Sequence, residues 1–245
     1  MNRDIFWLTI RELAGRRRLA LVVLLGVLPS LVSVAYRLGD QNTAAARWTA
    51  DTLLYNVIIT IFLPLVALIF GTSALGSEVE DGTAIFLLSK PVTRGSVISA
   101  KLMAAWALTA VFVVPAAAVS GAIAIWGTPE QGIITGFVVA CVLGALAYDS
   151  LFVMLSAFTT RALFVGLAYV FIWEGIINSI FSGTRFFSIR QCCLGVAALI
   201  SSASEETFSA NLSGLESIVI LAVAVVVPVW AAVRLLRMYQ VGESG

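Results

Sequence analysis

The stretch Ser77–Leu102, SEVEDGTAIFLLSKPVTRGSVISAKL, separates two long apolar runs and contains six charged residues. Charge is scarce elsewhere: of the 245 residues only 12% are charged and 60% are hydrophobic, and the mean hydropathy is +1.01. Soluble globular proteins carry about twice that share of charge, about a quarter of their residues. The sequence therefore predicts a membrane protein in which this stretch connects two membrane spans.

Six apolar segments are long enough to cross a bilayer, since about 20 mainly apolar residues span a hydrocarbon core of ~30 Å. They lie at 19–36, 53–76, 98–126, 133–158, 162–182 and 215–236. Little sequence is left for a soluble domain. We expect an all-α membrane protein with six transmembrane helices, forming one transmembrane domain over residues 1–245. Pro64, Pro115 and Pro228 should kink three of the spans.

The region ahead of the first span predicts an amphipathic helix within residues 1–18. Phe6, Ile10 and Leu13 share one helical face, whereas most of the arginines lie elsewhere. This pattern is typical of a helix that lies on the membrane surface. A cleavable signal peptide is the alternative, because the apolar run has a basic start and small residues near its end. The long region ahead of the run favours its retention as a span.

The distribution of basic residues predicts the orientation, because Lys and Arg favour short cytoplasmic loops. With the N-terminus inside, eleven basic residues lie on the inner side and four on the outer side. The inner set is Arg3, Arg11, Arg16, Arg17, Arg18, Lys90, Arg94, Lys101, Arg161, Arg234 and Arg237, and the outer set is Arg37, Arg47, Arg185 and Arg190. We expect a multi-pass protein of the cell (plasma) membrane with both termini in the cytoplasm and a cytoplasmic loop at 77–97.

An outer loop is expected at 183–214. It contains the apolar run Cys192–Ile200, which is too short to span a bilayer. We expect a re-entrant or interfacial helix there, with a collapsed loop as the alternative.

Residues that usually build catalytic or metal sites are scarce. The chain has no histidine, which removes the commonest general base and metal ligand. Its cysteines, Cys141, Cys192 and Cys193, do not have metal-ligand spacing. No basic run with interleaved aromatic residues suggests nucleic acid as a partner. We expect no catalytic site, no metal site and no cofactor in this chain.

Small residues recur every four positions in the fourth predicted span, at Gly132, Gly136, Ala140 and Gly144. Such a stripe lets a second helix approach closely. The partner helix can belong to the same chain or to a second copy in a dimer.

The internal loop itself predicts a short helix. Ser77 and Glu80 have the spacing of a capping box, residues 84–90 are mainly apolar, and Pro91 ends the run. A short apolar helix at the inner membrane face needs a surface to dock on. That surface can be its own bundle, lipid headgroups or a partner protein.

The loop resembles the first internal loop of the ABC type-2 exporter permease family. The resemblance rests on a Glu-x-Glu-x-Gly-Thr sequence, a Leu-Leu-Ser-x-Pro sequence, a hydroxyl with an arginine, and a lysine entering the next span. The residues are Glu78, Glu80, Gly82, Thr83, Leu87, Leu88, Ser89, Pro91, Thr93, Arg94 and Lys101. The run YVFIWEG at Tyr169–Gly175 and the order of spans extend the resemblance over the whole chain.

This resemblance implies the transmembrane permease subunit of an ABC exporter, which forms a homodimer or a heterodimer with a related permease. A separate ABC ATPase would bind ATP and Mg, in keeping with the absence here of a phosphate-binding G-x-x-x-x-G-K-[ST] loop. The loop helix would be the coupling helix that contacts the ATPase. Its implied contact residues are Glu78, Glu80, Asp81, Gly82, Thr83, Ile85, Phe86, Leu87, Leu88, Lys90 and Arg94. The first span, the fifth span and the re-entrant element would line the substrate path.

Two acids lie within predicted spans, Asp149 and Glu174. At 1.5 Å per residue they lie about 14 and 18 Å from the inner ends of their spans, so they could be neighbours. Intramembrane acids are candidates for function, and together with Trp173 and Asn178 they are our candidates for the substrate pathway. They could brace two helices, contact a cationic or polar substrate, or carry protons. The last role would make the chain a self-contained proton-coupled secondary transporter.

Overall fold

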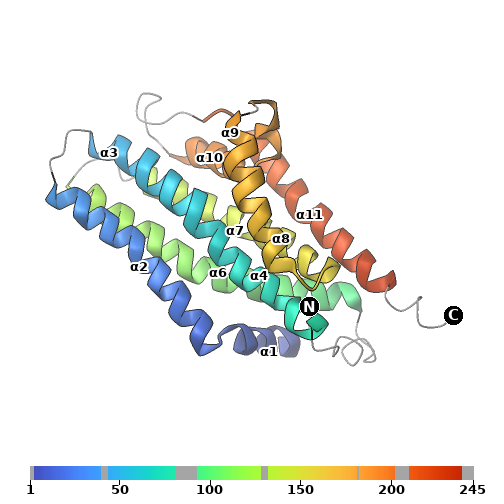
Figure 1. The fold of residues 1–245 in the computed structure, drawn as a ribbon. Coiled ribbons are helices and arrows are strands. Elements are labelled where there is room, and N and C mark those ends of the chain that lie inside the picture. The colour runs from blue at the N-terminus through green and yellow to red at the C-terminus, as the bar shows by residue number, and fades with distance from the viewer. Residues whose placement is uncertain are drawn as a thin grey trace.

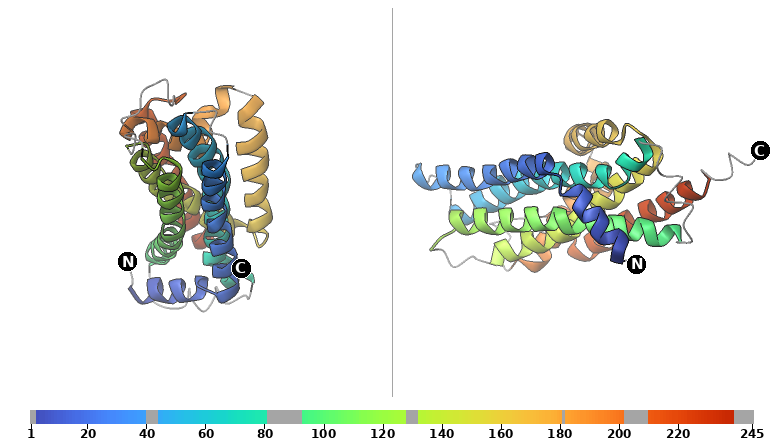
Figure 2. Two further views of the ribbon diagram at one scale, coloured as in Figure 1. Left: turned by 90° about the vertical axis from the view of Figure 1, so that its left-hand side faces the viewer. Right: turned by 90° about the horizontal axis from the view of Figure 1, so that it is seen from below.

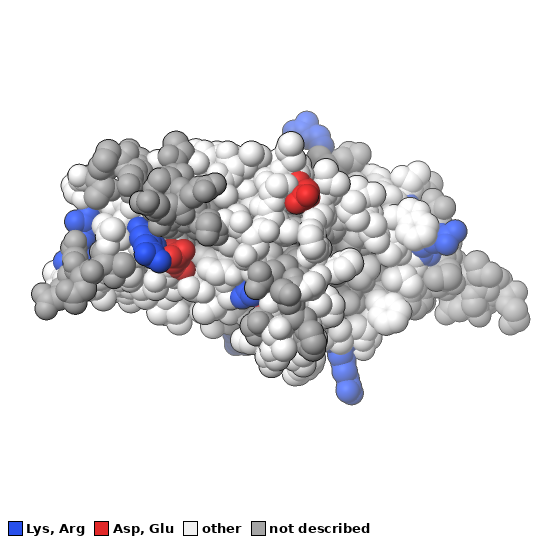
Figure 3. All heavy atoms as spheres, turned by 90° about the horizontal axis from the view of Figure 1, so that it is seen from above, with Lys and Arg blue, Asp and Glu red and all other residues white. Residues whose placement is uncertain are grey.

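The computed structural model describes residues 3–39, 44–80, 93–127, 132–180, 182–201 and 210–238. Within these ranges the chain forms helices joined by turns, which confirms the predicted all-α class. The long helices run side by side as a bundle, and the first helix lies across one end of it (Figures 1 and 2). Figure 3 shows one face of the molecule, on which charged side chains are few and scattered.

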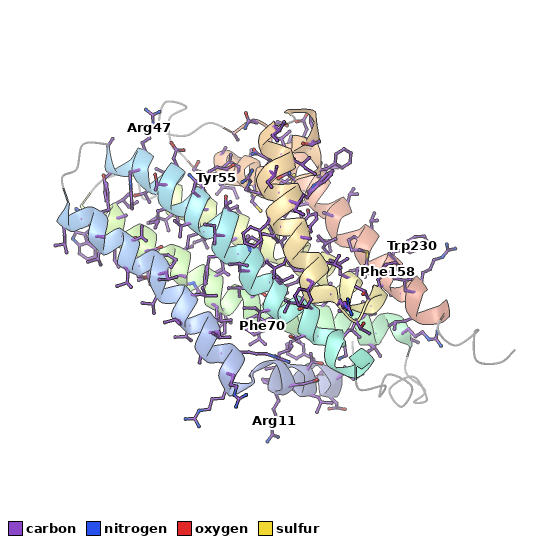
Figure 4. All side chains as sticks on the ribbon, in the orientation of Figure 1. Arg11, Arg47, Tyr55, Phe70, Phe158 and Trp230 are labelled. Carbon is purple, nitrogen blue, oxygen red and sulfur yellow. The ribbon has the colours of Figure 1, made fainter. Side chains whose placement is uncertain are left out.

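The N-terminal region forms two helices, α1 (Arg3–Leu13) and α2 (Arg16–Leu38). Helix α1 is amphipathic as predicted: Leu13 is buried against the bundle, whereas Arg11 points away from it (Figure 4). Helix α1 contacts α4 and α6. The chain leaves the helical conformation only at residues 14 and 15, so the arginine cluster at 16–18 begins α2 and is not part of the amphipathic helix.

The second predicted span is one helical run composed of α3 (Ala45–Trp48), η1 (Thr49–Phe62) and α4 (Leu63–Glu80). The η1 segment is a π-helix, and Pro64 lies where it changes to the α form. The predicted helix start at Ser77 is wrong, because α4 continues through Glu80. Inside a helix, each backbone N–H group bonds to a carbonyl of the preceding turn, so no cap is needed at Ser77. The next helix, α6 (Arg94–Ala124), likewise begins inside the expected loop.

Helix α7 (Gly132–Phe158) is the centre of the bundle and packs against α4, α6, α8, α10 and α11. Its predicted small-residue stripe receives α10 (Ile189–Ile200). A Cβ atom at Gly136 would lie 2.6 Å from the carbonyl oxygen of Ala197, and one at Gly144 would lie 2.5 Å from Cys193 Sγ. Both glycines therefore permit close packing within the same chain.

The C-terminal third contains one helical run followed by short elements and a final long helix. The run comprises α8 (Ala162–Ala168), η2 (Tyr169–Ile177, a π-helix) and α9 (Asn178–Ile180). The 3₁₀ helix η3 (Ser182–Phe187) precedes α10, and α11 (Gly214–Met238) follows. Residues 159–161 join α7 to α8 as a short connection.

Among the described residues, five helices are long and apolar enough to cross a membrane: Arg16–Leu38, Ala45–Gly76, Arg94–Ala124, Gly132–Phe158 and Gly214–Leu236. The predicted span at 162–182 corresponds to a shorter apolar helix, Ala162–Ile177. The structure therefore confirms a multi-pass arrangement of apolar helices but does not confirm six spans.

The two ends of the bundle are distinguished by what they contain. The end that holds α1, the start of α6 and the end of α11 is called the terminal end, and the opposite end is called the far end (Figure 1). At the far end, Arg37 donates to the carbonyls of Ile123 and Trp126, which joins α2 to the end of α6.

Pro228 shows how a proline is accommodated within the bundle. It lacks an N–H, so the carbonyl of Ala224 loses its donor within α11. Ser150 Oγ lies 3.0 Å from the Ala224 oxygen and 2.8 Å from the carbonyl oxygen of Ala147 in its own helix. The hydroxyl of α7 thus supplies a donor that α11 lacks.

Candidate functional site

Helix α10 begins in the middle of the bundle. Its first residues lie beside Glu174 of η2, Cys193 lies against Gly144, and Ala197 lies against Gly136. Since α7 starts at the far end, α10 runs back toward that end alongside it. The carbonyl of Phe187 accepts a 3.4 Å bond from Trp173 Nε1, so η3 runs alongside η2. The chain therefore passes into the bundle through η3 and returns through α10.

Glu174 fixes the start of α10. Its Oε1 accepts hydrogen bonds from Tyr148 Oη at 3.2 Å, Tyr169 Oη at 3.2 Å and the backbone N–H of Ile189 at 2.9 Å. Its Oε2 accepts a bond from Ser188 Oγ at 2.5 Å. The carboxyl is 3% exposed and faces the N-terminus of a helix, where negative charge is favoured. Four donors from α7, η2 and α10 thus converge on one side chain, which is called the Glu174 cluster.

Ser188 also caps α10, because its Oγ accepts a bond from the N–H of Gln191 at 3.3 Å. Sequence reasoning missed Ser188, Tyr148 and Tyr169 as members of the site. The spacing of Ser188 and Gln191 is that of a capping box, and it precedes an apolar run. This signal could have located the start of α10.

A second set of polar contacts connects α10 to η1. Gln191 Nε2 donates to Tyr55 Oη at 3.2 Å, and the guanidinium carbon of Arg190 lies 5.7 Å from the centre of the Tyr55 ring. Asn211 donates to Gln191 Oε1 at 3.3 Å. Figure 4 shows Tyr55 on the η1 segment, level with this part of the bundle. The start of α10 is therefore held from three sides.

Asp149 lies in a different environment. Its Oδ1 accepts a bond from Thr109 Oγ1 of α6 at 3.2 Å and lies 3.3 Å from the position of a Cβ at Gly71 of α4. Its Oδ2 is buried and has no hydrogen-bond partner among the described residues. Asp149 and Glu174 thus have separate sets of partners, and the structure does not join them in one site.

Asn178 and Trp173 accompany Glu174 on the same helical run. Asn178 is 3% exposed, and within the described part of the chain neither its Oδ1 nor its Nδ2 has a partner. Trp173 contacts η3 as described above. Of the four predicted pathway residues, Trp173, Glu174 and Asn178 thus lie on one segment near the start of α10, and Asp149 lies apart.

The predicted coupling residues fall mainly outside the described residues. This holds for Asp81, Gly82, Thr83, Ile85, Phe86, Leu87, Leu88 and Lys90, and for the side chains of Glu78 and Glu80. Arg94 is described, and its Nη1 donates to the carbonyl oxygen of Leu236 in α11 at 2.7 Å. Lys101 is 1% exposed, and its Nζ donates to the carbonyl oxygen of Ala74 in α4 at 2.5 Å. Residues 81–93, which join α4 to α6, are called the connecting segment. The start of α6, which follows it, is thus bonded both to α11 and to α4, the helix that precedes it.

Comparison with known proteins identifies the family. No curated protein sequence matches this chain. The model of the family described as ABC-2 family transporter protein matches residues 11–239, a range that contains all five long apolar helices. This match confirms the resemblance carried by the loop after α4, and the chain belongs to the ABC-2 family of transporter proteins.

Proposed function

We propose that this membrane permease component of an ABC transporter is an exporter subunit that works as a dimer and is driven by a separate ATPase. The observation that carries the proposal is the family match over residues 11–239, since permeases of this family are transmembrane subunits without an ATPase domain of their own. ATP and Mg would bind to the partner ATPase. The second permease subunit would be a copy of this chain or a related chain.

The connecting segment between α4 and α6 would contact the ATPase. Its flanks support this role, because Arg94 joins the start of α6 to the end of α11 and Lys101 joins α6 to α4. A buried ammonium group is costly to leave without a partner. A force applied to the connecting segment would therefore move α4, α6 and α11 together at the terminal end. ATP would drive transport by favouring one of two arrangements of the permease pair.

The protein would lie in the plasma membrane. Its orientation follows from the positive-inside count, which puts the terminal end of the bundle on the cytoplasmic side. Helix α1 would then lie on the inner membrane surface, with its exposed Trp7 and Leu8 in contact with lipid. Helix α10 would be a re-entrant element that enters from the outer side. Its polar start lies inside the bundle, where it is surrounded by protein and not by lipid.

The substrate path would run along the first span, the η2 segment and α10. Within it we assign different roles to the four candidates. Glu174 braces α10, because both of its oxygens already accept hydrogen bonds. Asn178 has polar atoms that no described residue pairs with, so it is the better candidate for substrate contact. Helix α2 exposes Leu21, Leu24, Leu28 and Leu31, an apolar face suited to lipid or to the second permease subunit.

Reconstitution with the partner ATPase tests the coupling role. Phe86→Asp places a charge in the apolar sequence 84–90 of the connecting segment, and Glu80→Lys reverses a charge that precedes this sequence. Each should lower transport at least tenfold while ATP hydrolysis continues. The control is Asp51→Lys, a reversal at the far end that breaks an exposed 3.8 Å ion pair with Arg47. Full transport by the Glu80 and Phe86 double variant would refute the coupling role.

The same vesicles test the alternative of a proton-coupled transporter. The proposed function requires ATP and the partner ATPase for any transport above background. Transport by the permease alone under a proton gradient would overturn it and would favour the proton-coupled alternative, with Asp149 and Glu174 as its proton carriers.

A further inference from the structure

A pocket of about 370 Å³ opens at the terminal end between α2, α4 and the start of α8. Helix α4 lies between the other two, as Figure 1 shows. The described lining residues are Arg18, Leu21, Ile69, Thr72, Ser73, Gly76, Thr160, Ala162 and Leu163. They include one cation and three hydroxyl groups but no acid. The pocket is distinct from the Glu174 cluster, which lies at the start of α10.

The lining changes from polar to apolar with depth. Arg18 lies in the first turn of α2, Thr160 lies in the turn that precedes α8, and Ser73 lies within one turn of the end of the apolar run Ala45–Gly76. One turn further from the terminal end, the walls are formed by Leu21 and Ile69. This order matches a lipid, whose polar headgroup lies at the membrane surface and whose acyl chain lies deeper.

The hydroxyl groups are available to a ligand. Ser73 Oγ and Thr160 Oγ1 make no hydrogen bond within the described part of the chain, whereas Thr72 Oγ1 donates to the carbonyl oxygen of Leu68 at 2.6 Å. A hydroxyl can donate a hydrogen bond to a phosphate oxygen. Two hydroxyls without a hydrogen-bond partner among the described residues and one guanidinium therefore face the same space from α2, α4 and the α7–α8 turn.

The position of Arg18 is unfavourable for the helix that contains it. Arg16, Arg17 and Arg18 form the first turn of α2, where the helix macrodipole disfavours positive charge. Within the described residues, none of the three forms an ion pair. A bound anion would offset this repulsion. Arg16 and Arg17 are exposed, whereas Arg18 is half-buried and lines the pocket.

We propose that this pocket binds the phosphate headgroup of an anionic phospholipid, with Arg18, Ser73 and Thr160 holding the phosphate and Leu21, Ile69 and Leu163 contacting the start of an acyl chain. Basic pockets between membrane helices are suited to such headgroups. A lipid bound there would lie between the first span and the α8–η2 segment. It would therefore tie these two helices together beside α4.

Native mass spectrometry of the purified full-length permease in detergent tests the site. Phosphatidylglycerol and phosphatidylcholine with identical acyl chains are titrated separately, and the first bound lipid is quantified. We expect phosphatidylglycerol to bind at least fivefold more tightly than phosphatidylcholine. Arg18→Gln should weaken phosphatidylglycerol binding about fivefold, which corresponds to about 1 kcal/mol for one arginine at an anionic surface. Phosphatidylcholine binding should not change.

Arg17→Gln is the matched control. It removes the same charge at the neighbouring position, and the Arg17 side chain does not line the pocket. It should weaken phosphatidylglycerol binding less than twofold. Equal losses in the Arg17 and Arg18 variants would show a diffuse surface attraction and overturn the site. If Arg18→Gln does not fold, the double variant Ser73→Ala with Thr160→Val replaces it, and unchanged phosphatidylglycerol binding by that variant would also overturn the site.

Inorganic phosphate separates a lipid from a free anion as the ligand. Phosphate at constant ionic strength should not displace phosphatidylglycerol at concentrations up to 100-fold above the lipid. Displacement at equal concentration would show that the acyl chain contributes nothing, and it would overturn the lipid assignment. The measurement needs no ATPase, so its outcome is independent of the coupling experiments above.

Discussion

Removal of the Glu174 carboxyl should release α10 from the centre of the bundle. Glu174→Ala deletes the acceptor of four hydrogen bonds that come from Tyr148, Tyr169, Ser188 and the backbone of Ile189. The three hydroxyl groups can rotate toward other acceptors. The N–H of Ile189 is fixed by the backbone and would remain buried without a partner.

The expected loss of stability follows from these four contacts. Hydrogen bonds between membrane helices contribute about 0.6 kcal/mol each on average, so four contribute about 2–3 kcal/mol. An unsatisfied buried N–H costs about 1–3 kcal/mol more. The sum is about 3–6 kcal/mol, which corresponds to a fall in Tm of about 6–24 °C at about 2–4 °C for each kcal/mol. Tyr148→Phe removes one donor and leaves the others, so it should cost less than about 1 kcal/mol.

Thermal unfolding of the detergent-purified permease measures this series, with Tyr169→Phe as a second single-donor variant. Glu174→Gln retains one acceptor oxygen and should fall between the alanine variant and the two phenylalanine variants. A Glu174→Ala protein with a Tm within 2 °C of Tyr148→Phe would refute the bracing role. Wild-type stability of Glu174→Ala together with complete loss of transport would assign Glu174 to the substrate instead.

Three further predictions concern the interior of the bundle. Gly136→Ala should lower the free energy of unfolding by about 1–3 kcal/mol, because the new Cβ would lie 2.6 Å from a backbone oxygen of α10. Gly95→Ala, which has open space around it, should not destabilise the protein in the same unfolding assay. Ser150→Ala should lower the free energy of unfolding by about 1 kcal/mol, and by less in a Pro228→Ala background that restores the missing N–H of α11. Equal losses in both backgrounds of this double-mutant cycle would contradict the role of Ser150 as the donor that replaces this N–H. Asp149→Asn should leave ATP-driven transport within about twofold of wild type, because Oδ1 keeps its Thr109 donor and a neutral side chain is cheaper to bury. If Asp149→Asn abolishes transport into reconstituted vesicles, the result would favour the proton-coupled alternative.

Hydropathy was sufficient to locate the long helices. The predicted span at 133–158 agrees with α7 to within one residue. Apolar runs of this length have few alternatives to a helix in lipid, because every backbone polar group must be satisfied within the segment. Helix ends were predicted less well. Ser77 and Glu80 have the spacing of a capping box, but nothing in the local sequence shows that Ser77 lies inside a helix that began at an earlier residue.

Positions across the bundle could not be predicted from spacing along the chain. The depth estimate placed Asp149 and Glu174 close to the same level, but it carried no information on which face of its helix each occupies. In the structure, Asp149 faces α4 and α6, whereas its neighbour Tyr148 faces Glu174. Tyr169 lies on η2 with Glu174 itself, whereas Tyr148 lies on α7 and Ser188 is the N-cap of α10. Only the folded arrangement brings Tyr148 and Ser188 to the carboxyl of Glu174.

The π-helical backbone of η2 has a consequence for how α10 is held. In a π-helix each N–H bonds to the carbonyl five residues earlier, whereas in an α-helix it bonds four residues earlier. Glu174 lies within this segment, and its direction therefore depends on which of the two bonding patterns the backbone adopts. A change of η2 from one pattern to the other would turn the carboxyl away from Ser188 and Ile189. The hydrogen-bond register of one helix thus sets whether Glu174 can reach the start of the neighbouring helix.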